Sequence, residues 1–135
     1  MKKITIALLT LLLLGAPSLA MAQDTENRSW TVTWLDAQAT DETTSVAMPV
    51  NANIDFGVYV EWSSGVSAGV VTIEEAYSQN YSGTWSTIGT VTTGAASSTD
   101  VYHQTGAFRS LRVRISTAVS GGTVTVYGIG RPAGQ

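Results

Sequence analysis

The sequence contains no cysteine, so it offers no disulfide, no thiol for lipid attachment and no thiolate metal ligand. Histidine occurs once, at His103, and zinc sites without cysteine need more than one histidine. Lysine is confined to Lys2 and Lys3, and no stretch beyond the first residues shows a helical period. These absences exclude a disulfide-stapled scaffold and a zinc centre, and they argue against a helical fold.

Residues 1–22 have the parts of a secretory leader: a basic start, a leucine-rich core and a small-residue exit at residues 20–22. The apolar run is shorter than the ~20 residues of a membrane-spanning helix. We expect a signal peptide over residues 1–22 and a single domain over residues 23–135, with no membrane span in the mature chain. The style of leader indicates a bacterial protein of the periplasm, cell surface or extracellular space.

The predicted mature chain is acidic, because its five arginines face ten carboxylates. Proteins that bind nucleic acid draw most of their affinity from cations placed against phosphates. We therefore expect no nucleic-acid partner. The three arginines Arg109, Arg112 and Arg114 alternate with apolar residues and are interpreted as the solvated face of a strand.

Alternation of apolar and polar residues predicts strands throughout the rest of the chain. The longest such run, Ile54 to Trp62, is interpreted as a central strand. Further strands are expected at 30–34, 44–48, 70–77, 85–91 and 101–104, with turn signals between them. Seven or eight short strands of this kind indicate an all-β fold, an antiparallel β-sandwich that is jelly-roll-like or Ig-like. A small barrel is the alternative.

The stretch from Phe108 to Gly130 predicts a β-hairpin. Leu111, Val113 and Ile115 would face the core, Gly121-Gly122 would form a tight turn, and the return strand would place Val124 and Val126 on the same apolar face. On the strand before it, strict alternation from Val71 would bury Glu75. Because an unpaired buried carboxylate is costly, we expect a bulge near Glu74-Glu75 that returns Ala76 or Tyr77 to the core.

The sequence places few reactive or metal-binding side chains where they could act together. Asp100 and His103 lack a nucleophile-elbow sequence, and Glu74 and Glu75 would point to opposite faces of a strand. Asp36, Asp41 and Glu42 share a loop without the spacing of an EF-hand. The sequence therefore predicts no catalytic residue, no metal site and no cofactor, and the protein is expected not to be an enzyme.

Aromatic side chains are the remaining candidates. Loop rings can stack on sugars or anchor a protein interface, and the candidate binding residues are Tyr77, Tyr81, Trp85 and Tyr102. An assembly surface is expected where an edge strand or an exposed strand face could meet a neighbour, and its candidate residues are Trp30, Trp34, Arg112 and Arg114.

The second half of the chain, with Gly-Thr-Trp before one strand and Arg-Val-Arg in a later one, resembles small β-sandwich domains of bacteriophage virion proteins and of extracellular bacterial modules. The resemblance implies a structural, decorating, receptor-binding or saccharide-binding module. We expect an exported structural or surface-assembly subunit that associates with itself or with other surface proteins. A carbohydrate-binding module is one alternative, and a virion decoration or receptor-binding protein is the other, although virion proteins usually lack such a leader.

Overall fold

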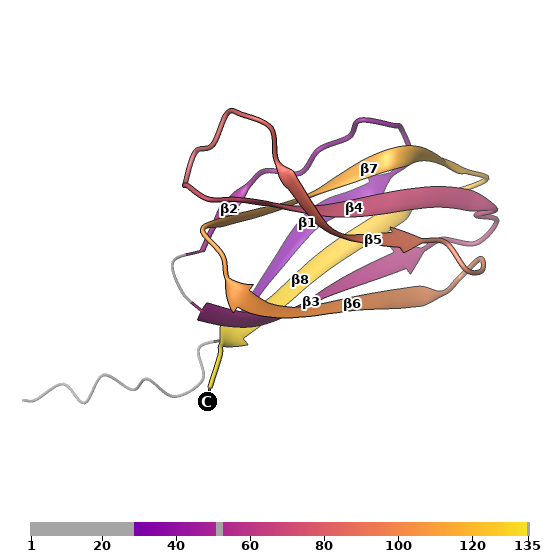
Figure 1. Ribbon diagram of the computed structural model, residues 1–135. Helices are drawn as coiled ribbons and strands as arrows, with labels where there is room; N and C mark the ends of the chain where they lie inside the picture. The colour runs from indigo at the N-terminus through magenta and orange to yellow at the C-terminus, as the bar shows by residue number, and fades with distance from the viewer. Residues whose placement is uncertain (1–28, 51–52, 135) are drawn as a thin grey trace, which may run out of the picture.

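The computed structural model describes residues 29–50 and 53–134, so the predicted leader lies outside the described residues. Eight strands form two antiparallel sheets (Figure 1), one in the order β1-β8-β3-β6 and the other in the order β2-β7-β4-β5. Their bounds are β1 Trp30–Gln38, β2 Met48–Pro49, β3 Asn53–Trp62, β4 Ala68–Ala76, β5 Ser86–Thr92, β6 Thr99–Ala107, β7 Ser110–Ser120 and β8 Val124–Pro132. The predicted all-β antiparallel sandwich is confirmed.

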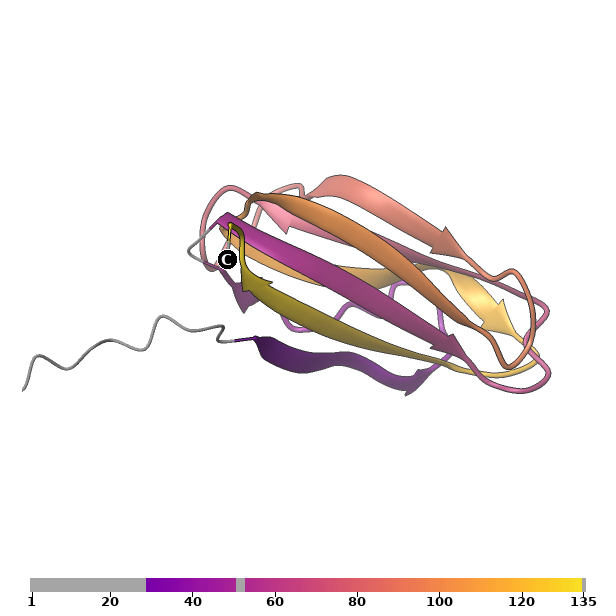
Figure 2. The ribbon, with the colours of Figure 1, turned by 90° about the horizontal axis from the view of Figure 1, so that it is seen from below.

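The strand order decides between the expected sandwich types. The chain folds back on itself so that β1 lies beside β8, β2 beside β7, β3 beside β6 and β4 beside β5. This nested pairing, split between two facing sheets, is the jelly roll rather than the immunoglobulin arrangement. Figure 2 shows the first sheet from below, with β1 and β6 at its two edges.

The central strand is β3, as its alternation predicts. Ile54, Phe56, Val58, Val60 and Trp62 are each at most 3% exposed, and β3 pairs with β8 on one side and β6 on the other. Leu111, Val113 and Ile115 of the facing sheet are completely buried. One apolar core therefore fills the space between the two sheets.

The predicted hairpin from Phe108 to Gly130 is wrong in one respect. β7 and β8 do follow one another and do bury the expected residues, but they belong to different sheets and do not pair. The connection at Gly121-Gly122 crosses the sandwich as an arch. Alternation could not reveal this, because two strands that face each other across a core bury the same side chains as two strands paired in one sheet.

A second arch supports the first. Residues 63–67 connect β3 to β4 across the same end, where the Ser63 amide donates to the Thr123 carbonyl at 3.0 Å and the Ser67 amide donates to the Ser120 carbonyl at 2.9 Å. Gly65 and Gly121 both have positive φ, 86° and 80°, and their backbones lie against each other. No side chain would fit between them, so glycine is required for the close approach.

Candidate functional site

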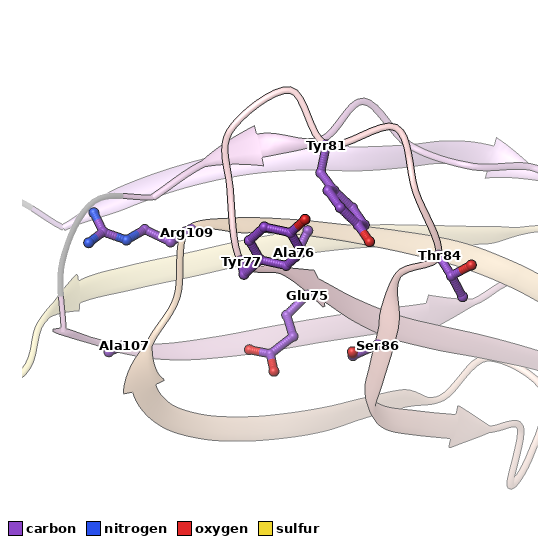
Figure 3. A pocket seen from close by; sticks show the side chains of 8 residues that line it. All are labelled: Glu75, Ala76, Tyr77, Tyr81, Thr84, Ser86, Ala107 and Arg109. Atoms are coloured by element: carbon purple, nitrogen blue, oxygen red, sulfur yellow. The ribbon is translucent and has the colours of Figure 1, made fainter.

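A pocket of about 230 Å³ opens at one end of the sandwich, where β4 ends and the chain enters the long loop to β5 (Figure 3). The end of β6 and the start of the β6–β7 connection form its opposite wall. In Figure 3 the loop stands above the sheet and carries Tyr81. Eight residues line the pocket: Glu75, Ala76, Tyr77, Tyr81, Thr84, Ser86, Ala107 and Arg109.

The carboxylate in this pocket belongs to Glu75, and its position corrects a prediction. β4 pairs with β7 without interruption from Val71 to Ala76, so Glu75 lies opposite Leu111 on the inward side. The irregularity is on β5, where Ile73 pairs with Gly89 and Glu74 with Thr87, leaving Ile88 as the extra residue. No bulge on β4 turns Glu75 away. Its carboxylate is tolerated because the space between the sheets opens here into the pocket, which keeps the side chain half-exposed.

The expected return of Ala76 or Tyr77 to the core is also wrong for Tyr77. Ala76 is 6% exposed but stands apart from the inter-sheet core, whereas the Tyr77 side chain is 78% exposed at the rim of the pocket. The bulge in this part of the sheet lies instead on β5, at Ile88.

Three of the four predicted binding aromatics form a continuous ladder. The Tyr77 and Tyr81 rings lie 4.8 Å apart with edge-to-face geometry, and the Tyr81 and Trp85 rings lie 6.0 Å apart in the same manner. The Arg112 guanidinium covers the Trp85 ring at 4.3 Å. Trp85 is only 9% exposed, so it supports the ladder, and the tyrosines are the rings that face the pocket.

The fourth predicted aromatic, Tyr102, lies elsewhere. From β6 its ring reaches over Gly89 of the opposite sheet, packs against Phe56, and donates its hydroxyl to the Ile88 carbonyl at 2.6 Å. It thus closes the side of the sandwich between β5 and β6. Burial, followed by the negative charge of Glu75, raises the pKa of the Tyr102 phenol.

The two tryptophans predicted for assembly point inward from β1. A side chain at Gly128 or Gly130 would collide with the ring of Trp34 or Trp30, so each indole rests on a glycine of β8. Trp34 is 7% exposed and belongs to the core, and Trp30 packs against that core. A surface role for Trp34 would therefore require β1 to leave its own sheet, and the assembly role of this strand stays a prediction.

The two arginines predicted for assembly are held in ion pairs on the outer face of the second sheet. Arg112 contacts Glu74 at 2.7 Å, while Arg114 contacts Glu74 at 3.4 Å and Glu42 at 3.3 Å. The side chains of both arginines are 24% exposed, and the Glu74 side chain is 6% exposed. The interpretation as a freely solvated strand face is therefore wrong for these two arginines. Their part in assembly is still a prediction.

Asp100 and His103 have separate partners, although His103 lines a second pocket together with Asp55 and Arg131. The Asp100 carboxylate accepts the indole N–H of Trp62 at 2.7 Å, and His103 is exposed with its ring against Tyr59. Within residues 29–50 and 53–134, no group of three or more potential metal ligands occurs. The same residues include no helix long and apolar enough to cross a membrane.

Sequence reasoning missed Glu75 and Arg109 as pocket residues. The signal for Glu75 was present, since alternation placed this carboxylate inward, but the bulge was expected to remove it. Arg109 lies just before β7 in the β6–β7 connection and lines the pocket with Glu75. Its location depends on how β6 and β7 sit in opposite sheets, which local patterns do not indicate.

No protein-family model and no curated protein matches this sequence. Among solved structures, the crystal structure of the SPBc2 prophage-derived protein YomS is similar with a TM-score of 0.55 and 13% identity, over 78% of this chain and 94% of that chain. A chain from the disulfide-linked pili of Bacillus endospore appendages has a TM-score of 0.45 and 15% identity, over 78% and 86%. The first likeness shows a shared fold. The resemblance to phage-derived β-sandwich domains that the sequence indicated is thereby confirmed at the level of the fold.

Proposed function

We propose that the protein is an exported, non-enzymatic structural subunit that assembles with further copies of itself through the edge strand β6. The observation that carries the proposal is the regularity of this edge. All nine residues from Asn53 to Glu61 of β3 pair with β6 in an unbroken register. An edge strand of this length and regularity presents a row of backbone groups suited to pairing with another chain.

The other three sheet edges are interrupted. β1 has two register shifts along β8 and a positive φ of 48° at Ala37. β2 has only two residues, one of them Pro49, and β5 has the extra residue at Ile88. Short strands, proline and bulges are devices by which proteins prevent edge pairing. β6 has none of these devices.

The side chains of β6 do not protect it either. Residues 99–107 contain no lysine, arginine, glutamate or proline, and the single carboxylate, Asp100, is engaged by Trp62. Val101 is 45% exposed on the outer face of the sheet. Two copies of β6 could therefore pair in antiparallel fashion about a two-fold axis, because no like charges would face each other across the pair. Such pairing would join two four-stranded sheets into one.

The proposal of export depends on the predicted leader at residues 1–22. Export is also the feature that distinguishes a surface subunit from the virion alternative. The fold shared with a prophage-derived protein is compatible with either role, since a fold alone assigns no function. Amino-terminal sequencing of protein secreted from or retained by the producing cell distinguishes the two. A chain that begins at Gln23 outside the cytoplasm supports the surface subunit, whereas an uncleaved cytoplasmic chain favours the virion role.

Sedimentation velocity of the mature protein over a wide concentration range tests the assembly. We expect concentration-dependent association, and Val101→Lys should weaken it by about tenfold or more, because a lysine on an edge strand opposes pairing. Thr31→Lys is the matched control, since this exposed position lies on the same face at the opposite edge, β1. Thermal unfolding of both variants checks that each is folded. A wild-type protein that stays strictly monomeric, or one equally affected by both substitutions, would overturn the proposal.

A further inference from the structure

The pocket beside Tyr77 contains two opposite charges that have no ion-pair partner among the described residues. Glu75 and Arg109 both line it, and neither forms a salt bridge within the described residues, although Glu74, next in sequence to Glu75, pairs with two arginines. In Figure 3 the Glu75 carboxylate lies among the lining side chains, whereas the Arg109 side chain starts beside them and its guanidinium extends away from Glu75. Each is thus available to a ligand.

These two charges restrict the ligand. An anion would be opposed by Glu75, a cation by Arg109, and an apolar molecule would leave both ionised groups without hydrogen-bond partners. A neutral ligand that both donates and accepts hydrogen bonds satisfies the carboxylate, which only accepts, and the guanidinium, which only donates. Thr84 and Ser86 add hydroxyl groups of either kind to the same pocket. Polyhydroxylated molecules have this property.

The ladder of aromatic rings formed by Tyr77, Tyr81 and Trp85 supplies the apolar platform that such a ligand needs. Tyr77 is largely exposed, yet its ring is held against Tyr81, which in turn rests on the buried Trp85. A fixed ring loses little conformational freedom on binding, so it makes an effective contact surface for the apolar face of a sugar. Thus an exposed aromatic ring and several polar groups meet at one pocket, as in most small-ligand sites.

The size of the pocket indicates how much of the ligand it holds. Its volume of about 230 Å³ is below the roughly 300 to 1,000 Å³ of sites that enclose a drug-sized molecule. A single terminal sugar is therefore a better fit than a long segment of a chain. We propose that this pocket binds the terminal unit of a neutral saccharide, with Tyr77 stacking on the ring, Glu75 accepting from its hydroxyls and Arg109 donating to them.

The test uses the full mature protein and a printed array of glycans that end in neutral hexoses, N-acetylhexosamines, sialic acids or uronic acids. We expect binding to neutral termini, and Tyr77→Ala should weaken it by about tenfold, as the loss of an aromatic contact predicts. Glu75→Gln should also weaken it. Tyr127→Ala is the control, because this half-exposed tyrosine lies on β8, on the outer face of the other sheet.

Three outcomes would overturn the inference: no binding to any neutral terminus, binding confined to the acidic termini, or binding that survives Tyr77→Ala unchanged. Since Tyr77 is exposed and Glu75 half-exposed, both variants should fold, and their thermal unfolding verifies this. Sedimentation of Tyr77→Ala is measured in parallel. Association that persists while glycan binding is lost shows that the pocket and the β6 edge act independently, so failure of one proposal leaves the other standing.

Discussion

Glu74 and Glu75 are neighbours on β4, and the two regions around them differ sharply. Glu74 faces outward, yet its side chain is only 6% exposed, because Arg112 and Arg114 close over it. Glu75 faces the space between the sheets, where a carboxylate would ordinarily be unfavourable, but it remains half-exposed at the pocket and forms no ion pair with the described residues. The outward carboxylate is the enclosed one, and the inward carboxylate is the accessible one.

The difference shows that the side of a strand does not by itself determine the environment of a charge. Long arginine side chains can bury a carboxylate on an outer sheet face, since their aliphatic stems cover it while the guanidinium groups pair with it. The end of a sandwich can expose an inward residue. This contrast fits a structural role for Glu74 and the ligand-binding role that we propose for Glu75, and the first two of the predictions that follow test it.

The largest effect is expected for Glu74→Ala. Its removal leaves two partly buried guanidinium groups without their shared carboxylate, which should lower the free energy of unfolding by about 2 to 4 kcal/mol. Glu75→Ala, the matched control one residue away, should change it by less than about 0.5 kcal/mol, as is usual for accessible side chains. Urea unfolding measures both values. Equal losses would mean that the two carboxylates are not divided as we describe.

An intermediate effect is expected for Arg112→Ala. The substitution removes the 2.7 Å contact with Glu74 and uncovers the Trp85 ring, so it should cost about 1 to 3 kcal/mol of unfolding free energy. Arg109→Ala should be almost silent in the same urea experiment, because Arg109 is exposed and outside the ion-pair cluster. If Arg109→Ala proved the more damaging change, the pocket would be a structural element.

The smallest effect concerns an exposed ion pair, Asp55 with Arg131. Hydrogen bonds from Arg131 and then Thr105 lower the pKa of the Asp55 carboxyl below its ordinary 3.8. A lowered pKa in the folded state contributes stability above the unfolded-state pKa, and this contribution disappears as the pH falls through the folded-state pKa. Urea midpoints of wild type and Asp55→Asn should therefore differ slightly near neutral pH and converge in strong acid. A gap that widened on acidification would contradict the direction of the shift.

Much of the fold could be predicted because it depends on short-range patterns. The alternation around Val58 and Ile115 identifies strands and their buried faces, since a side chain's face depends only on its place along its own strand. Pairing depends on contacts between distant residues. Local patterns therefore predict a hairpin at Gly121-Gly122, although β7 and β8 lie in opposite sheets.

The candidate site was predicted in part for the same reason. Tyr77, Tyr81 and Trp85 are close in sequence, so their meeting in one loop region could be anticipated. Tyr102 lies on β6, and Arg109 lies in the connection that crosses from β6 to β7. Which of the two reaches the pocket depends on that crossing, and no local pattern encodes it.

The nested strand order also determines how the domain responds to tension. Because β1 and β8 are antiparallel neighbours, Trp30 at the start of one strand lies opposite Gly130 near the end of the other. A force that separates these two ends pulls across the ladder and opens its hydrogen bonds one after another, beginning at that pair. A force along a strand would instead have to break many bonds at once. If copies pair through β6 as we propose, a pull along the strands loads that pairing in this second way, and side-to-side association would then resist force better than a linkage through the chain ends.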